Sequence, residues 1–409
     1  MTLRDGFYGI SLLLLPISAF LTSTEWILGR NAMFLALGIL IIQFVVNREN
    51  YNTLSTKRWL LIALAVGAVA LSQCWWVMKY ENKEESQLLA NVNYTVTYPF
   101  LFSFSILILA TSAIPRDVIY RFRFVLLMVI CLAFGVKVIQ GGYIYFSEKS
   151  IRANIGGIST TAAYLMTLQG LLCLYAINKI ATHYKRFLII LVSILTFAII
   201  VMTGTRSAMV IFPIILIIMA LNSLAVKDYR KVLPALVVLF AMPLFISHQI
   251  RERFVELYYD ISQDSVNNST SIGSRFSMWQ SGFYTAGRHP FGQSAESRLN
   301  EVTQYIEINE RGNKEALRNI PYHLHNELLE IASLQGVLPA VLMLIFYFMT
   351  IMAFRKNGKN GLAIYTFTLP LFYFGVGDVL MIYPKAIVCV LSILCLYSVL
   401  SKVDNEVRS

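Results

Sequence analysis

Residues 321–330 read PYHLHNELLE and lead without a break into the apolar run IASLQGVLPAVLMLIFYFMTIMAF at residues 331–354. A run of this length can cross the hydrocarbon core of a bilayer as a helix, for which about 20 apolar residues suffice. The polar stretch before it carries two of the five histidines in the chain and two glutamates. A membrane span therefore begins where a polar segment rich in ionisable side chains ends, and the fold and the candidate chemistry meet at this junction.

Apolar runs of the same kind recur along the whole chain. The 409 residues are 57% hydrophobic and 14% charged, whereas a soluble protein has about 25% charged residues. The runs long enough to span a bilayer lie approximately at residues 7–23, 27–46, 59–78, 97–114, 122–146, 158–180, 186–203, 207–226, 232–248, 331–354, 362–381 and 384–401. No signal-peptide cleavage site stands out, so the first run is interpreted as a span. We predict an all-α polytopic membrane protein with about 12 transmembrane helices.

The distribution of basic residues predicts the orientation of these helices. The formal net charge is +11, and most Lys and Arg residues lie in short clusters between the apolar runs. The loops and ends on one side carry 18 basic residues, and the short loops on the opposite side carry 7. Because basic residues are enriched on the cytoplasmic side, both termini are expected to be cytoplasmic. The clusters act as topology signals, so we expect membrane lipids as partners and no nucleic acid.

One long polar segment, residues 249–330, lies between the ninth and tenth predicted spans on the outer side. It separates residues 1–248, with nine spans, from residues 331–409, with three spans and a cytoplasmic tail. Loops of this length are usually functional, so we expect this one to carry catalytic residues. Short helices are predicted within it, with a turn at residues 287–292; these helices cover residues 250–261, 274–284, 294–305 and 313–318.

The histidine-rich stretch allows two interpretations. Read as a helix, residues 321–330 place His323, Glu327 and Glu330 on one face, and Pro321 suits a first helical turn. A histidine in that turn would be favoured in its neutral form, which can accept a proton. An amphipathic helix whose histidines only face lipid headgroups fits the same spacing, and the spacing does not choose between the two.

Three arginines lie on the outer side, against the topological trend. Arg206 occupies a tight turn in the sequence TGTRS at residues 203–207, Arg275 lies on the helix predicted at 274–284, and Arg152 lies between the fifth and sixth spans. Snorkelling to the interface would also explain Arg206, and contact with a lipid phosphate would explain Arg275. One guanidinium group can bind two phosphate oxygens at once. The three arginines and the two histidines could therefore together form a diphosphate pocket.

Motifs of several other enzyme classes are absent from the sequence. It contains no Asp-x-Asp pair, Walker loop, Gly-x-Gly-x-x-Gly, His-Glu-x-x-His or Gly-x-Ser-x-Gly. All five cysteines lie within predicted spans, so neither a disulfide framework nor a zinc site is indicated. We expect no metal and no cofactor. Asp378, near the outer end of the eleventh span, is expected to pair with Lys385 or an arginine and to have a structural role.

These motifs together resemble the bacterial O-antigen ligase family, and the resemblance covers nearly the whole chain in length, number of spans and position of the loop. The outer loop that ends in His-Asn is shared with O-antigen polymerases, whereas two stretches are more specific to ligases. The residues that carry the resemblance are His323-Leu324-His325-Asn326-Glu327 followed by Gly336, the turn at 203–206, Gly273-Ser274-Arg275, Ser294-Ala295-Glu296-Ser297-Arg298 and Gly377-Asp378-Val379.

The resemblance implies a membrane-embedded, GT-C-like glycosyltransferase of lipopolysaccharide biosynthesis, in the inner membrane. Such an enzyme moves O-antigen from undecaprenyl diphosphate to a sugar hydroxyl of lipid A–core at the periplasmic face. His325, which directly precedes Asn326, takes the place of the family's essential histidine, the general base. The residues expected to bind the diphosphate are Arg206, Arg275 and Arg152. The residues expected to support them are His323, Asn326, Glu327, Asp378 and Lys385.

The general base and the diphosphate leaving group together predict a metal-independent reaction that inverts the anomeric centre. Two other functions fit part of the sequence. An O-antigen polymerase uses the same donor with a second lipid-linked glycan as the acceptor. A transporter of lipid-linked glycans fits the number of spans, but the two halves of the chain do not match as transporter halves usually do.

Overall fold

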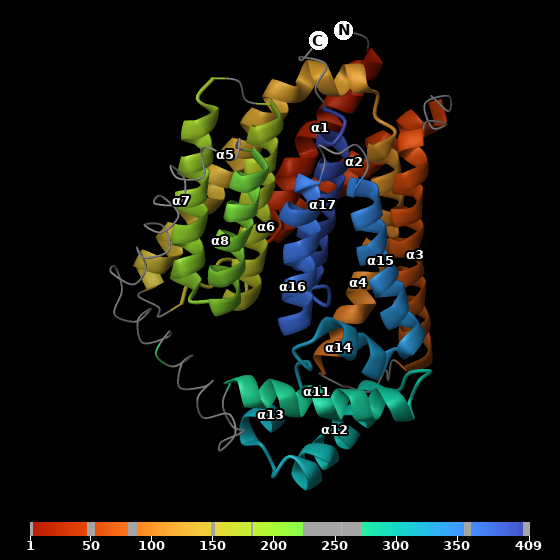
Figure 1. Cartoon of the computed structure of the whole chain (residues 1–409). Helices are drawn as coiled ribbons and strands as arrows, with labels where there is room; N and C mark the ends of the chain where they lie inside the picture. The colour runs from red at the N-terminus through yellow and green to blue at the C-terminus, as the bar shows by residue number, and fades with distance from the viewer. Residues whose placement is uncertain are drawn as a thin grey trace.

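The computed structural model describes residues 3–46, 54–80, 88–148, 152–180, 183–223, 255, 271–355 and 361–403. Within these residues every regular element is a helix. Long apolar helices stand side by side in a bundle, and four shorter helices lie together at one end of it (Figure 1). Both chain ends lie at the opposite end of the bundle.

Among the helices that the structure describes, eight are long and apolar enough to cross a membrane. These are α1 (Leu3–Leu21), α2 (Trp26–Val46), α3 (Leu54–Tyr80), α4 (Leu89–Ser112), α5 (Arg116–Glu148), α6 (Ser159–Ile180), α7 (Lys185–Thr203) and α15 (Val337–Arg355). Further apolar helices, shorter than these eight, complete the described part of the bundle. They are α8 (Arg206–Ser223), the π-helical η3 (Ile364–Thr368) with α16 (Leu369–Gly377), and α17 (Pro384–Leu400).

The prediction of an all-helical, polytopic membrane protein is thereby confirmed. The ninth predicted span, at residues 232–248, lies outside the described residues, so the number of twelve spans stays a prediction.

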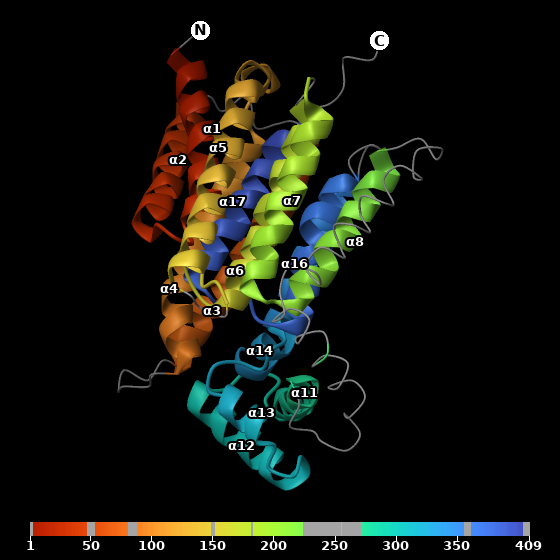
Figure 2. The same ribbon diagram turned by 90° about the vertical axis from the view of Figure 1, so that its left-hand side faces the viewer.

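The helices α6 and α17 form the centre of the bundle, where the other spans surround them (Figure 2). Both are apolar on all sides, as a helix without a lipid-facing or water-facing stripe must be. Their tyrosines Tyr175 and Tyr397 pack with ring centroids 4.7 Å apart. Buried polar groups pair across helices, as between the hydroxyls of Ser18 and Ser392 at 2.8 Å. Such pairs join spans in a medium without water.

The four helices that lie together at the end of the bundle are α11 (Ser271–Arg288), α12 (Ala295–Asn309), α13 (Lys314–Asn319) and α14 (Glu327–Leu334). We call α11, α12 and α13 the outer helices. In Figure 1, α11 lies across the end of the bundle, below α14. The helices predicted at 274–284, 294–305 and 313–318 are confirmed, each somewhat longer or shifted by a residue. The helix predicted at 250–261 lies outside the described residues except for residue 255.

Backbone contacts fix the outer helices against the spans. The turn between α11 and α12 contains Gly292, and the break between α14 and α15 contains Gly336; both have positive φ, 86° and 104°. A Cβ atom on Gly292 would lie 2.7 Å from the carbonyl oxygen of Gln335, so only glycine permits this approach. The Trp76 indole N–H on α3 donates to the Gln293 carbonyl at 2.9 Å, which ties the same turn to the bundle.

The structure corrects the interpretation of residues 321–354. The predicted helix at 321–330 is wrong for its first half, because residues 321–326 form a turn and α14 begins at Glu327. Asn326 caps α14: its backbone is extended, and its side chain accepts a hydrogen bond from the Leu329 N–H at 3.1 Å. The predicted span 331–354 is broken at Gly336, so the membrane-spanning helix begins at Val337.

Candidate functional site

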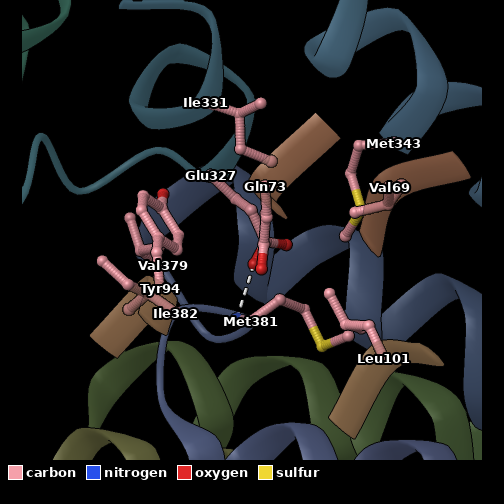
Figure 3. A pocket seen from close by; sticks show the side chains of 10 residues that line it. All are labelled: Val69, Gln73, Tyr94, Leu101, Glu327, Ile331, Met343, Val379, Met381 and Ile382. Atoms are coloured by element: carbon pink, nitrogen blue, oxygen red, sulfur yellow. Dashed lines mark hydrogen bonds between the residues drawn. The ribbon is translucent and has the colours of Figure 1, made fainter. Parts of the chain in front are cut away.

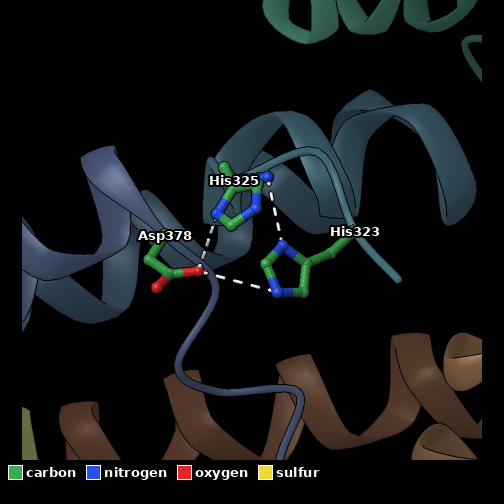
Figure 4. Close-up of side chains that lie close together, drawn as sticks. All are labelled: His323, His325 and Asp378. Carbon is green, nitrogen blue, oxygen red and sulfur yellow. Dashed lines mark hydrogen bonds and ion pairs between the residues drawn. The ribbon is translucent and has the colours of Figure 1, made fainter. Parts of the chain in front are cut away.

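The rings of His323 and His325 meet in the turn that precedes α14. Their centroids are 4.3 Å apart and their planes are nearly perpendicular. Both rings point at Asp378, which follows the last residue of α16 (Figure 4). Asp378 Oδ1 lies 3.2 Å from Nδ1 of His325 and 3.6 Å from Nε2 of His323. One carboxylate oxygen therefore faces two imidazoles.

The contacts assign different roles to the nitrogens of the two histidines. The backbone N–H of His325 donates to Nδ1 of His323 at 3.2 Å, so a neutral His323 carries its proton on Nε2, toward Asp378. In His325 it is Nδ1 that faces Asp378, which leaves Nε2 on the other side of the ring. The side chain of His325 is 23% exposed and that of His323 only 7%. His325 is therefore the histidine that a substrate can reach.

Burial and charge set the protonation states of the two buried members of the cluster. Burial lowers the pKa of His323 to about 4, although the nearby Asp378 carboxylate acts in the opposite direction. Burial would raise the pKa of Asp378, but the hydrogen bond from His325 and the charges of both histidines outweigh it and bring this pKa to about 2. At neutral pH the site therefore combines an ionised Asp378 with a neutral His323.

Three contacts hold the histidine turn in place. His325 has a φ of 50°, which side chains other than glycine rarely adopt. The indole N–H of Trp279 on α11 donates to the His325 carbonyl at 3.2 Å, and the Leu324 N–H donates to Glu330 Oε2 at 2.8 Å. Glu330 also forms a buried ion pair with Arg298 of α12 at 2.8 Å. The outer helices therefore maintain the conformation in which His325 faces Asp378.

Asn326 and Glu327 connect the start of α14 to the segment that carries Asp378. The Asn326 side-chain amide donates to the Val376 carbonyl at 3.2 Å. Glu327 accepts from the Met381 N–H at 2.6 Å and from the Tyr347 hydroxyl at 2.7 Å. Burial raises the pKa of Glu327 to about 7 although these hydrogen bonds lower it. These side chains are positioned to fix the two segments relative to each other.

A small, mainly apolar cavity lies behind this connection, and Glu327 points into it beside Met381 (Figure 3). Gln73 of α3 and Tyr94 of α4 supply the other polar groups of its wall. The remaining lining residues are Val69, Leu101, Ile331, Met343, Val379 and Ile382. Neither histidine lines the cavity, nor does Asp378, so it is separate from the histidine cluster.

The structure brings two of the three predicted arginines to one turn. The chain leaves α7 through Gly204, which has a φ of 65°, and enters α8 at Arg206. Arg152 reaches this turn from the loop before α6 and donates from Nε to the Thr203 carbonyl at 3.0 Å. Both arginines are partly buried.

Arg275 approaches the same region from α11. It lies one helical turn before Trp279, on the face of α11 that packs against the histidine turn. Its charge acts on the Tyr164 hydroxyl in α6, as does the charge of Asp378. That hydroxyl lies 3.2 Å from the Ser207 hydroxyl, next to Arg206. Asp378, Arg275 and the first turn of α8 therefore all lie in the neighbourhood of Tyr164.

Tyr164 is the site residue that sequence reasoning missed. Its ring stacks on Phe374 of α16 with centroids 4.1 Å apart, and the side chain is buried. It is one of 22 tyrosines and lies within an apolar run, so no sequence signal distinguishes it.

The expected partner of Asp378 was wrong. In the described part of the chain its ion-pair partners are His323 and His325, whereas Lys385 donates to the Gly156 carbonyl at 3.3 Å. The chain turns away after α16 through residues 378–383, which places Lys385 on the first turn of α17. Lys385, predicted to support the site, is exposed and contacts the loop before α6 instead.

His323, His325 and Asp378 also have the ligand types of a metal site. One ligand atom from each lies within 4.8 Å of the others. Two imidazoles and a carboxylate are a frequent ligand set for zinc. The expectation of metal-independent chemistry therefore has to be tested with a chelator.

Fold and site define a class: a multi-pass, all-helical membrane protein with a histidine–carboxylate cluster and arginines at one end of its bundle. A family model described as O-Antigen ligase matches residues 191–345, which include Arg206, Arg275, His323 and His325. Over 273 residues the chain is 29% identical to the O-antigen ligase of Escherichia coli (strain K12). The match covers 65% of this chain and 64% of that relative, slightly less than two thirds of its length. Both comparisons show that the chain is similar to O-antigen ligases, in line with the resemblance of its sequence motifs.

Proposed function

We propose that the protein is an O-antigen ligase, which transfers O-antigen polysaccharide from undecaprenyl diphosphate to a sugar hydroxyl of lipid A–core. The observation that carries the proposal is the contact of His325 with the buried Asp378, opposite the face of α11 that bears Arg275. The family match supports it, because the matched region contains both His325 and Arg275. The site lies at the end of the bundle opposite the two termini, which supports a periplasmic active site and cytoplasmic ends.

In this reaction His325 acts as the general base. Its Nδ1–H is directed at Asp378, so Nε2 has the lone pair that accepts the proton of the acceptor hydroxyl. The ionised Asp378 then stabilises the imidazolium that forms, and it holds the ring in the correct tautomer. His323 is neutral and buried, and it serves as a second partner of the carboxylate rather than as a base.

The arginines stabilise the leaving group. As the acceptor oxygen bonds to the anomeric carbon, the bond from that carbon to the diphosphate oxygen breaks, and its electron pair stays on the diphosphate. Arg206 and Arg275, with Arg152 beside the first, bind this growing negative charge. Among the described residues no carboxylate lies within ion-pair distance of Arg275, which leaves its charge available for an anion. Attack opposite the leaving group inverts the anomeric centre.

The test is transfer by purified protein from a lipid-linked donor to lipid A–core, with EDTA present throughout. We expect the wild type to transfer, and His325→Ala to lose a factor of about 10²–10⁴ in rate, the usual contribution of a general base. Loss of wild-type activity in EDTA, restored by added zinc, would refute the metal-independent mechanism. Transfer only to a second lipid-linked glycan would identify a polymerase instead. Retained anomeric configuration in the NMR spectrum of the product would refute direct inversion.

A further inference from the structure

One face of α11 connects the proposed phosphate-binding arginine with the proposed base. Arg275, Trp279 and Gly282 follow one another at intervals of four and three residues, so they lie on the same side of the helix. Trp279 donates its indole N–H to the His325 carbonyl, and Gly282 lies against Leu324 of the histidine turn. Side chains four residues apart on a helix are about 5–6 Å apart at Cβ. Trp279 therefore lies between Arg275 and His325.

The proposed reaction places one sugar in this interval. The sugar that reacts is joined through its anomeric carbon to the diphosphate, which Arg275 binds. The same carbon receives the oxygen that His325 deprotonates. The first sugar of the donor must therefore lie between Arg275 and His325, beside Trp279.

Two aromatic side chains are available to that sugar. Phe276 and Trp279 contact each other edge to face, with centroids 5.6 Å apart and planes at 74°. Trp279 is partly buried, whereas the Phe276 side chain is 48% exposed and therefore accessible to a ligand. The face of an aromatic ring is electron-rich and attracts the weakly positive C–H edges of a neighbouring group, such as those on one side of a pyranose. Ligand sites commonly combine such aromatic walls with a few polar groups.

We infer that Phe276 and Trp279 form the binding subsite for the first pyranose of the lipid-linked donor, an inference that rests on the proposed function. The ring packs on Phe276 and Trp279 with its anomeric carbon toward His325 and its diphosphate toward Arg275. Trp279 has a second task, because its N–H also holds the His325 carbonyl. Phe276 forms no hydrogen bond through its side chain, so its replacement tests the aromatic contact alone.

The experiment compares Phe276→Leu and Phe276→Tyr in the purified transfer reaction, with donor and acceptor concentrations varied separately. Leucine keeps an apolar side chain but has no aromatic face, whereas tyrosine keeps the face. We expect Phe276→Leu to raise the KM for donor about five- to tenfold and to leave the KM for acceptor unchanged. Phe276→Tyr should stay within about twofold of wild type. Phe283→Leu is the matched control, because Phe283 is 66% exposed on the same helix, two turns further along.

Each outcome decides the inference. An active wild type with an unchanged donor KM in Phe276→Leu would overturn the subsite and leave the proposed function intact. A rise in the acceptor KM alone would assign the aromatic pair to the acceptor sugar and also overturn it. Equal loss in Phe276→Leu and Phe283→Leu would indicate a general role of apolar groups at the membrane surface. Wild-type protein without any transfer would overturn the proposed function and this inference together. Thermal unfolding of each variant serves as the control for folding.

Discussion

The substitution Asp378→Asn isolates the electrostatic part of the site. Asparagine keeps the size of the side chain and an oxygen that accepts from the Val379 N–H, a bond of 2.9 Å in the wild type. It removes the negative charge that lies 3.2 Å from Nδ1 of His325. The same oxygen faces His325 and Val379, so an amide that keeps its oxygen there retains the Val379 bond but brings no negative charge to His325. An amide turned with its NH₂ toward His325 loses the Val379 bond and favours the wrong tautomer, with the proton on Nε2. We expect a folded protein with impaired transfer.

The magnitude follows from the pKa of Asp378. The interactions with the histidines and with Val379 bring this pKa from 3.8 to about 2 in spite of burial. This difference in pKa corresponds to about 2 kcal/mol, or a factor of several tens in an equilibrium constant. Asp378 is only 5% exposed, so water screens little of this energy. We expect most of this interaction energy to stabilise the imidazolium of His325. The transfer rate of Asp378→Asn should therefore fall roughly 10- to 100-fold.

The assay is a double-mutant cycle of Asp378→Asn and His325→Ala in the purified transfer reaction. Because Asp378 acts through His325, the double variant should transfer no more than about threefold more slowly than His325→Ala alone. Size-exclusion chromatography and thermal unfolding establish that the variants are folded. A wild-type rate in Asp378→Asn, or fully additive losses in the double variant, would refute the role of Asp378 as the orienting partner.

Three further predictions concern the charges around the site. Arg206→Ala and Arg275→Ala should each abolish most transfer while the protein still inserts into membranes. Lysine at either position should restore little activity, because its ammonium group cannot form the bidentate contact that a guanidinium forms with a phosphate. Loss of the protein from membrane fractions would instead support a role of these arginines in insertion. Burial raises the pKa of Glu327 from its usual 4.5 to about 7 in the folded protein, so the stabilising contribution of this group is present below about pH 4.5 and lost as pH rises through 7. Glu327→Gln should therefore gain up to about 3 kcal/mol relative to wild type between pH 5 and pH 8, measured by thermal unfolding at both values; an equal difference at the two pH values would contradict this. Arg298→Ala leaves the buried Glu330 carboxylate without its ion-pair partner and should destabilise the protein by about 3–5 kcal/mol, seen as a lower unfolding temperature or faster proteolysis of the outer helices; a melting curve like that of wild type would refute it.

The local pattern of the sequence was a reliable guide to the spans but not to the histidine turn. The helical interpretation of residues 321–330 relied on the spacing of His323, Glu327 and Glu330. The spacing of Glu327 and Glu330 does belong to a helix, α14, but Asn326 caps that helix and excludes both histidines from it. The conformation of His325 depends on Trp279 and, through Leu324, on Glu330. Trp279 belongs to another segment, and the Leu324–Glu330 bond does not follow helical spacing, so the local pattern predicts neither contact.

The amino-acid sequence alone determined that this chain crosses a membrane many times, and its motifs resemble those of O-antigen ligases. Apolar length and the sign of loop charges act locally, segment by segment, and can be read without knowledge of the fold. Only the tertiary structure decided that Asp378 faces His325, that Tyr164 lies in the neighbourhood of Asp378 and Arg275, and that Lys385 contacts Gly156 instead. The residues that meet are 50 or more positions apart in the chain. They meet because helix packing and burial, which depend on the whole bundle, bring α6, α11 and the end of α16 to the same place.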